Sequence, residues 1–120
     1  MALVLVVDDE PIVRQVLGRL VTEAGHEVEE AASGTHALQK CEEKQPAIVF
    51  TDLQMGGMDG LTLIERLRAS HPEVKLLAVS GFQDLLERAE SLGVPVMKKP
   101  CRLDDVARKI EQLLEGSDRP

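Results

Sequence analysis

Residues 3–11 read LVLVVDDEP, an unbroken apolar run that ends in two aspartates, a glutamate and a proline. Five consecutive Leu and Val residues are typical of a strand that is covered on both faces. Proline is well placed in the first turn of a helix, so Pro11 predicts a helix directly after the acidic residues. The stretch therefore predicts a strand, an acidic turn and a helix, which is the repeating unit of an α/β fold.

The same alternation continues along the whole chain. Repeated strand and helix units imply right-handed crossovers and a doubly wound parallel sheet with helices on both faces. The expected strands cover residues 3–7, 27–31, 47–51, 74–79 and 95–98. Apolar stripes at helical spacing occur at Ile12, Val13, Val16, Leu17, Leu20 and Val21, at Leu61, Ile64 and Leu67, and at Val106, Ile110, Leu113 and Leu114.

Length, charge and cysteine content limit the class of protein. A chain of 120 residues with 43% hydrophobic content fits one domain, expected over residues 1–115, with residues 116–120 as a tail or the start of a linker. The net charge of −7 argues against direct binding to nucleic acid or anionic membranes. Cys41 and Cys101 lack zinc-ligand spacing and are expected to be reduced thiols. With no signal peptide or membrane span, we expect a cytoplasmic protein.

Polar side chains follow four of the five expected strands. They are Asp8 and Asp9 after the first strand, Asp52 after the third, Ser80 after the fourth, and Lys98 and Lys99 after the fifth. Because the carboxyl ends of parallel strands meet at one edge of the sheet, we expect these side chains in one crevice. Three carboxylates require a cation, and oxygen ligands suit Mg²⁺, which keeps waters for exchange with phosphate oxygens. The sequence therefore favours phosphoryl chemistry.

The charges of these side chains indicate different roles. A carboxylate is a competent nucleophile toward an activated phosphoryl group, and Asp52 is best placed for that role. Asp8 and Asp9 would hold the metal ion, while a lysine after the fifth strand supplies a mobile cation to the phosphoryl oxygens. Ser80 can donate to a phosphoryl oxygen only once one is present. Its movement would therefore bias a conformational equilibrium after phosphorylation.

Four short motifs carry these residues. They are VVDDEP at 6–11, TDLQMGGMDG at 51–60, VSG at 79–81 and KKP at 98–100. In combination they resemble the response-regulator receiver domain of two-component signalling, over essentially the whole chain. The resemblance implies a flavodoxin-like fold with five parallel strands in the order 2-1-3-4-5 and five helices.

The same resemblance implies site roles and partners. It implies phosphorylation of Asp52 by a histidine kinase or a histidine phosphotransfer protein, and no enzymatic activity beyond self-catalysed phosphotransfer and autodephosphorylation. It implies that Lys99, rather than Lys98, is the lysine that contacts the phosphoryl oxygens, and that the peptide bond between Lys99 and Pro100 is cis. The Mg²⁺ ligands that it implies are Asp8, Asp9, Asp52 and the backbone carbonyl of Gln54.

Three features depart from the family pattern. Gly56 stands where the family usually has proline, and the Gly56-Gly57 pair should make the loop after Asp52 more mobile. Val96 stands where the family often has an aromatic switch residue. Residues 82–92 leave room for only a short or irregular fourth helix. Its expected apolar face comprises Phe82, Leu85, Leu86, Ala89 and Leu92.

Three other functions fit these residues less well than a phosphoreceiver does. A small Mg²⁺-dependent aspartyl phosphatase would need a general acid two residues after its nucleophile, and Gln54 cannot titrate. A flavodoxin-like cofactor binder would have to place an anionic cofactor beside Asp8, Asp9 and Glu10, which would repel it. A degenerate receiver that serves only as a docking module would not need intact acidic and lysine positions.

The expected partner surface includes residues 13–17 and the edge near Lys99, because docking onto a helix surface is the common use of this fold. The sequence does not identify an output domain or effector, although VSGF at 79–82 resembles the same stretch of receivers attached to hybrid kinases.

Other polar and sulfur-containing residues are given structural roles. Aspartates that precede helices are interpreted as caps or dipole partners, namely Asp59, Asp104 and Asp105. Surface positions are expected for His26, His36 and His71, and packing beneath the Asp52 loop for Met55 and Met58.

Overall fold

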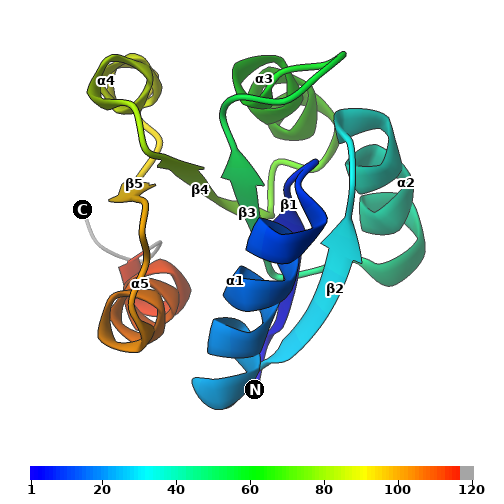
Figure 1. Cartoon of the computed structure of the whole chain (residues 1–120). Helices are drawn as coiled ribbons and strands as arrows, with labels where there is room; N and C mark the ends of the chain where they lie inside the picture. The colour runs from blue at the N-terminus through cyan, green and yellow to red at the C-terminus, as the bar shows by residue number, and fades with distance from the viewer. Residues whose placement is uncertain (117–120) are drawn as a thin grey trace.

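Five parallel strands form one sheet in the order β2-β1-β3-β4-β5, as Figure 1 shows. The structure is a computed structural model and describes residues 1–116. The strands are β1 (Leu3–Val7), β2 (Glu27–Ala31), β3 (Ile48–Asp52), β4 (Lys75–Ser80) and β5 (Val96–Lys98). The expected strand order is confirmed. Because β3 and β4 each end one residue later than expected, Asp52 and Ser80 are the last residues of their strands.

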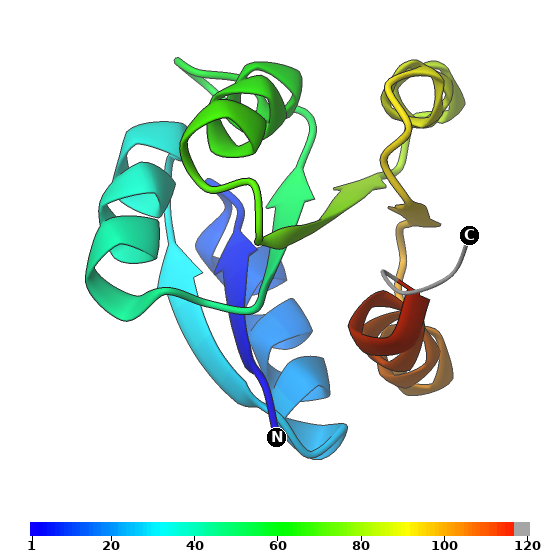
Figure 2. The ribbon, with the colours of Figure 1, turned by 180° about the vertical axis from the view of Figure 1, so that it is seen from behind.

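Helices cover both faces of the sheet, with α1 and α5 on one face and α2, α3 and α4 on the other (Figures 1 and 2). The helices are α1 (Pro11–Glu23), α2 (Gly34–Lys44), α3 (Gly60–Ser70), α4 (Gln83–Ser91) and α5 (Leu103–Gly116). The fourth helix has nine residues, which confirms that it is short. In the described part of the chain no helix is both long and apolar enough to span a membrane. Of the tail expected at 116–120, Gly116 is the last residue of α5, and residues 117–120 lie outside the described part of the chain.

Alternate residues of the central strands enter two separate hydrophobic clusters. On β1, Val4 and Val6 pack toward α1 and α5, whereas Leu5 and Val7 pack toward the opposite helices. Phe50 of β3 is fully buried among the first of these groups. Each such side chain stabilises the fold by roughly 1.5–3 kcal/mol relative to an exposed position. Burial of both faces fixes the register of β1 and β3, and thereby the position of their carboxyl ends.

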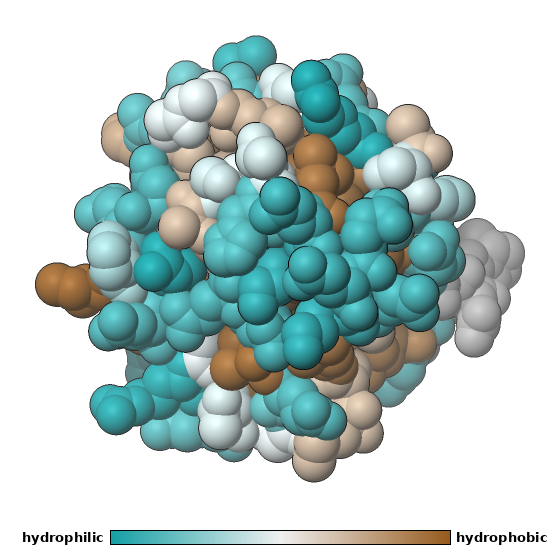
Figure 3. All heavy atoms as spheres, turned by 90° about the vertical axis from the view of Figure 1, so that its right-hand side faces the viewer, coloured by the Kyte–Doolittle hydropathy of each residue, from teal (hydrophilic) through white to brown (hydrophobic). Residues whose placement is uncertain are grey.

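The edge strand β2 is an exception to the apolar composition of the other strands, because three of its five residues are glutamates. Its glutamates are exposed or half-buried, and two of them form ion pairs with neighbouring helices. Lys40 Nζ lies 2.7 Å from Glu29 Oε1, and Arg14 Nε lies 3.0 Å from Glu30 Oε1. Figure 3 shows that the face over β2 and α2 is mainly hydrophilic. Charged side chains on an edge strand discourage pairing with another sheet, which explains the exception.

Some apolar residues expected in helix stripes are exposed instead. On α1, Leu17 and Val21 are buried, but Ile12 is 76% exposed and Val16 is 55% exposed. The spacing identifies the helix correctly, yet the sheet covers only one side of the predicted stripe. Phe82 and Leu92 are likewise exposed, because they flank α4 rather than lie within it.

The aspartates that were expected to cap helices or to interact with helix dipoles lie at the starts of α3 and α5. Asp59 caps α3, because its Oδ1 accepts a hydrogen bond of 2.8 Å from the Thr62 backbone. Asp104 and Asp105 lie in the first turn of α5, where carboxylates favour the helix dipole. The three histidines expected at the surface, His26, His36 and His71, are all half-buried. The side chain of His71 is 12% exposed, and its Nε2 lies 3.3 Å from Glu42 Oε1.

The sulfur-containing residues lie mainly in covered positions. Cys41 is buried and Cys101 is half-buried, and both are free thiols. Burial raises the pKa of each thiol to about 11, so neither is a ready nucleophile at neutral pH. Met55 is buried in the core after β3, while Met58 is partly buried and packs beside Gly34.

Candidate functional site

The sheet register brings the acidic residues of β1 and β3 together. Val7 of β1 pairs with Thr51 of β3. Asp8, the residue directly after β1, therefore lies beside Asp52, the last residue of β3. One carboxylate oxygen from each of Asp8, Asp9 and Asp52 lies within 4.8 Å of the other two. The acidic cluster expected from the sequence therefore forms, and it is able to hold a metal ion.

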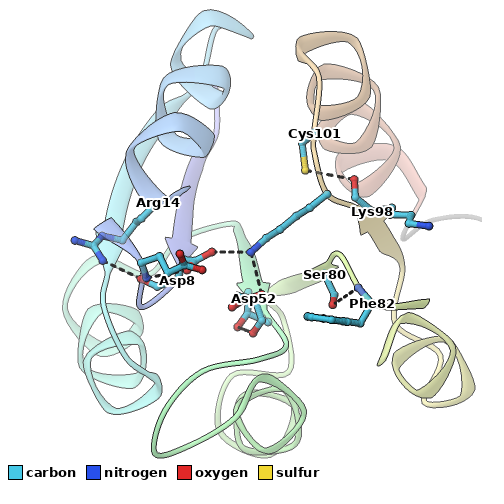
Figure 4. Close-up of polar contacts among 10 residues, drawn as sticks. Asp8, Arg14, Asp52, Ser80, Phe82, Lys98 and Cys101 are labelled. Atoms are coloured by element: carbon cyan, nitrogen blue, oxygen red, sulfur yellow. Dashed lines mark hydrogen bonds and ion pairs between the residues drawn. The ribbon is translucent and has the colours of Figure 1, made fainter. Parts of the chain in front are cut away.

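The ammonium group of Lys99 lies between two of these carboxylates. Figure 4 draws these two contacts as the dashed lines that reach Asp8 and Asp52. Its Nζ lies 3.0 Å from Asp8 Oδ2 and 3.1 Å from Asp52 Oδ1. The side chain of Lys99 is 23% exposed, that of Asp8 only 1% and that of Asp52 only 7%. Lys98 is exposed and extends away from the cluster, so of the two lysines the structure brings only Lys99 to the site.

The charges in the cluster do not balance. Burial raises the pKa of Asp52, and the negative charge of Asp8 raises it further, against the lowering by Lys99 and by a backbone hydrogen bond from Gln54. Burial alone would lower the pKa of Lys99, but its hydrogen bonds to Asp8 and Asp52 outweigh burial and raise it. The cluster thus holds three carboxylates, of which the ammonium group of Lys99 contacts two, and the site favours a further cation.

The backbone and side chain of Asp8 are held by several hydrogen bonds. Its Oδ1 accepts from the Glu10 backbone at 2.9 Å, and its carbonyl oxygen accepts from Arg14 Nη1 at 2.8 Å. Its own backbone N–H donates to the Ala31 carbonyl at 3.2 Å. Arg14 was missed from the sequence, although a basic residue in the first turns of the helix after an acidic pair is a usable signal.

Asp9 differs from Asp8 because it is exposed. Its Oδ2 accepts a hydrogen bond of 3.1 Å from the backbone N–H of Gly56, in the loop between β3 and α3. Gln54 lies in the same loop, two residues after Asp52, and its side chain is exposed. The loop therefore passes beside both acidic strand ends.

Ser80 lies at the same edge of the sheet but does not contact the carboxylates in this state. It is 1% exposed, and its Oγ accepts a hydrogen bond of 3.0 Å from the backbone N–H of Phe82, the residue before α4 (Figure 4). Ser80 pairs with Lys98 across β4 and β5. The hydroxyl group therefore links the end of the central sheet to the start of the short helix.

Gly60 allows α3 to begin directly against the end of β3. A Cβ atom at position 60 would lie 2.2 Å from the carbonyl oxygen of Asp52 and 2.7 Å from Cα of Leu53. Real Cβ atoms do not approach backbone atoms so closely, so the position requires glycine. The sequence pattern gives no sign of this contact.

An apolar groove opens beside the cluster, between α1 and the segment after β5. Its volume is about 370 Å³. The exposed Ile12 and Val16 belong to its wall, and the Lys99–Pro100 peptide bond, which is cis as expected, lies on the opposite side. The full lining is Ile12, Val13, Val16, Leu17, Leu20, Val79, Lys99, Pro100 and Cys101.

Known proteins share this fold and this sequence pattern. The family model described as "Response regulator receiver domain" matches residues 4–111. The sensor kinase CckA of Brucella abortus is 38% identical over 125 aligned residues, which cover 98% of this chain and 13% of that kinase. The chain spans about a third or less of the length of several curated relatives.

Solved receiver structures superpose on the chain over nearly their whole length. The receiver domain of NtrX from Brucella abortus has a TM-score of 0.87 at 30% identity, covering 93% of this chain and 98% of that one. The receiver domain of the hybrid histidine kinase CckA has a TM-score of 0.79 at 32% identity, covering 94% of this chain and 99% of that one. The chain belongs to the response regulator receiver domain family.

Proposed function

We propose that the chain accepts a phosphoryl group on Asp52 from a phosphohistidine of a kinase or a phosphotransfer protein, and that this changes its contacts with partners. The observation that carries the proposal is the bridging position of Lys99 Nζ, 3.1 Å from Asp52 Oδ1 and 3.0 Å from Asp8 Oδ2. A mobile cation beside a carboxylate at a sheet edge suits a phosphoryl acceptor, because the transition state needs its oxygens neutralised.

Asp8, Asp9, Asp52 and the backbone carbonyl of Gln54 would hold a Mg²⁺ ion. The fit is supported by an oxygen-only donor set whose three carboxylates converge within 4.8 Å, and by the excess negative charge of the cluster. When bound, Mg²⁺ supplies positive charge to the phosphoryl oxygens.

Asp52 acts as the nucleophile in this proposal. One carboxylate oxygen forms a bond to phosphorus while the bond between phosphorus and the donor imidazole nitrogen breaks, and the nitrogen keeps the electron pair. The ammonium of Lys99 then follows the phosphoryl oxygens. Burial of Asp52 limits access of water to the acyl phosphate. We propose phosphotransfer and autodephosphorylation as the only reactions of this chain.

Ser80 would convert phosphorylation into a structural change. Its Oγ now accepts the Phe82 backbone N–H, 3.0 Å away. Rotation of the hydroxyl toward a phosphoryl group on Asp52 would release that N–H at the start of α4. Since Val96 offers no aromatic ring to follow this movement, the readout would depend on α4 itself.

The apolar groove beside Lys99 is the proposed docking surface for the phosphoryl donor. Ile12 and Val16 are large exposed apolar residues on α1, and the groove that they line runs alongside Lys99. A helix of the donor that covers them would bring its phosphohistidine next to Asp52.

The free thiols Cys41 and Cys101 support action in the reducing cytoplasm.

Beryllofluoride, a stable mimic of a phosphoryl group, tests the proposed acceptor. With Mg²⁺ present, we expect it to shift the backbone amide NMR signals of Ser80, Gly81 and Phe82 in the wild-type chain. The Asp52→Asn variant should show no such shifts. Equal shifts in the two proteins, or none in the wild type, would contradict the proposal.

A further inference from the structure

The loop between β3 and α3 contacts the acidic turn after β1 through one backbone group. Gly56 N–H donates to Asp9 Oδ2 at 3.1 Å, joining residues 47 positions apart. We propose that this N–H is a positioning donor for the cation site: it holds the exposed carboxylate of Asp9 in the orientation that binds a divalent cation. The inference rests on the proposed function of the acidic cluster.

Asp9 needs such a donor more than its neighbours do. Asp8 is buried, and its side chain accepts hydrogen bonds from Glu10 and Lys99. Asp9 is exposed, and within residues 1–116 the Gly56 N–H is the hydrogen-bond donor to its carboxylate. An exposed aspartate without a partner samples several rotamers. Binding of a cation then restricts the side chain to one rotamer, and this loss of conformational entropy weakens binding.

The held orientation is also the one in which the cluster is assembled. With the Gly56 bond in place, an oxygen of Asp9 lies within 4.8 Å of oxygens of Asp8 and Asp52. A carboxylate has about four acceptor sites, so the hydrogen bond leaves room for a cation. Hydrogen bonds to ligating carboxylates generally orient them and raise metal affinity.

Only a residue with a backbone N–H can fill this role at position 56. Proline at this position would have no N–H to donate. Alanine retains the donor, and a Cβ at this position would meet Asp9 Oδ2 at 3.9 Å, an ordinary contact. Gly56 has no left-handed backbone angle, whereas Gly57 has a φ of +72°. Gly56→Ala and Gly56→Pro are therefore a matched pair.

The test is a Mg²⁺ titration of the folded chain, followed by the backbone amide NMR signals of residues 7–9 and 51–53. We expect Gly56→Pro to weaken Mg²⁺ binding about tenfold, the lower end of the effect of losing a hydrogen bond to a metal ligand. Gly56→Ala should bind within about twofold of wild type. Equal affinity in Gly56→Pro and wild type overturns the inference, as does an equal loss in both variants.

A double-mutant cycle separates this effect from a general change of loop shape. In an Asp9→Ala background, Gly56→Pro should cause no further loss of Mg²⁺ affinity, because the acceptor is gone. A tenfold loss in that background as well would show that proline acts through the loop and not through Asp9. If Gly56→Pro does not fold, hydrogen exchange of the Gly56 amide decides: it should be faster in Asp9→Ala than in wild type, and an unchanged rate overturns the inference.

Failure of this inference is distinguishable from failure of the proposed function. If Asp52 still accepts a phosphoryl group while Gly56→Pro binds Mg²⁺ normally, only the role of Gly56 is wrong. If the wild-type chain shows no response to Mg²⁺ at all, the proposed cation site itself is wrong.

Discussion

Lys99 Nζ lies 3.1 Å from Asp52 Oδ1, although the two residues are 47 positions apart in the chain. The contact joins the end of β3 to the residue after β5, so it depends on β4 lying between them in the sheet. Lys99 supplies positive charge where a bound cation and phosphoryl group would later meet. Its removal should therefore affect the metal-free protein most.

Lys99→Met should lower the free energy of unfolding by about 2 kcal/mol in the absence of Mg²⁺. That value is below the 3–5 kcal/mol for breaking a fully buried ion pair, because Lys99 is 23% exposed. Added Mg²⁺ should restore much of the loss, since it replaces the missing positive charge. Urea unfolding with and without Mg²⁺ measures both effects. Lys98→Met is the matched control and should change stability by less than about 0.5 kcal/mol; similar losses in the two variants would contradict the role of Lys99.

Asp52→Asn should stabilise the metal-free protein at pH 7, by roughly 1 kcal/mol. The folded pKa of Asp52 is raised from its ordinary value of 3.8 by burial, so the folded state binds this proton more tightly than the unfolded state. The stability contribution of Asp52 is therefore greatest at low pH and is lost as pH rises through its folded pKa. The advantage of the asparagine should therefore fade as pH falls through the folded pKa of Asp52, and it should be absent below the ordinary pKa of 3.8. Thermal unfolding at several pH values tests this, and an advantage that is independent of pH would refute it.

Gly60→Ala should destabilise the fold by about 3 kcal/mol, despite the higher helix propensity of alanine. The new Cβ would lie 2.2 Å from the Asp52 carbonyl oxygen, which can move only if α3 or the end of β3 shifts. Gly34→Ala is the control, because its Cβ would meet the flexible side chain of Met58, 2.7 Å from Sδ. We expect a loss of about 1 kcal/mol there. Equal losses in urea unfolding would mean that α3 adapts without strain.

Val16→Asp should slow phosphotransfer from the kinase or phosphotransfer partner at least tenfold, because a charge in the apolar groove disfavours docking. Labelling of the variant by the small donor acetyl phosphate should be unchanged, since Val16 contributes no side chain to the acidic cluster. Leu92→Asp, a similar change at an exposed residue after α4, should leave both reactions unaffected. Slower labelling by acetyl phosphate would show that Val16→Asp damages the site rather than the docking surface.

The doubly wound parallel sheet and the convergence of polar side chains at one edge follow from the sequence pattern, whereas the strand order and the choice of Lys99 over Lys98 rested on the resemblance to receiver domains. Buried parallel strands are marked by continuous apolar runs, and the geometry of the sheet then fixes which strand ends meet. Helix periodicity predicts which side of α1 faces the sheet, but not how much of that side the sheet covers. The exposure of Ile12 and Val16 could therefore not be predicted.

The path of the loops was not predictable either. The contacts of Gly56 and Gly60 depend on how the segment after β3 folds back, and they involve backbone atoms that leave no pattern in the sequence. The ion pairs of β2 and the partial burial of His71 likewise depend on neighbours that are distant in the chain.

Mass spectrometry after incubation with acetyl phosphate and Mg²⁺ can locate the phosphoryl acceptor itself. The wild-type chain should gain one phosphoryl group, and borohydride reduction followed by peptide analysis should place it on Asp52. Asp52→Asn should gain none under the same conditions. A phosphoryl group on another residue, or an equal gain in Asp52→Asn, would contradict the assignment of Asp52 as the acceptor.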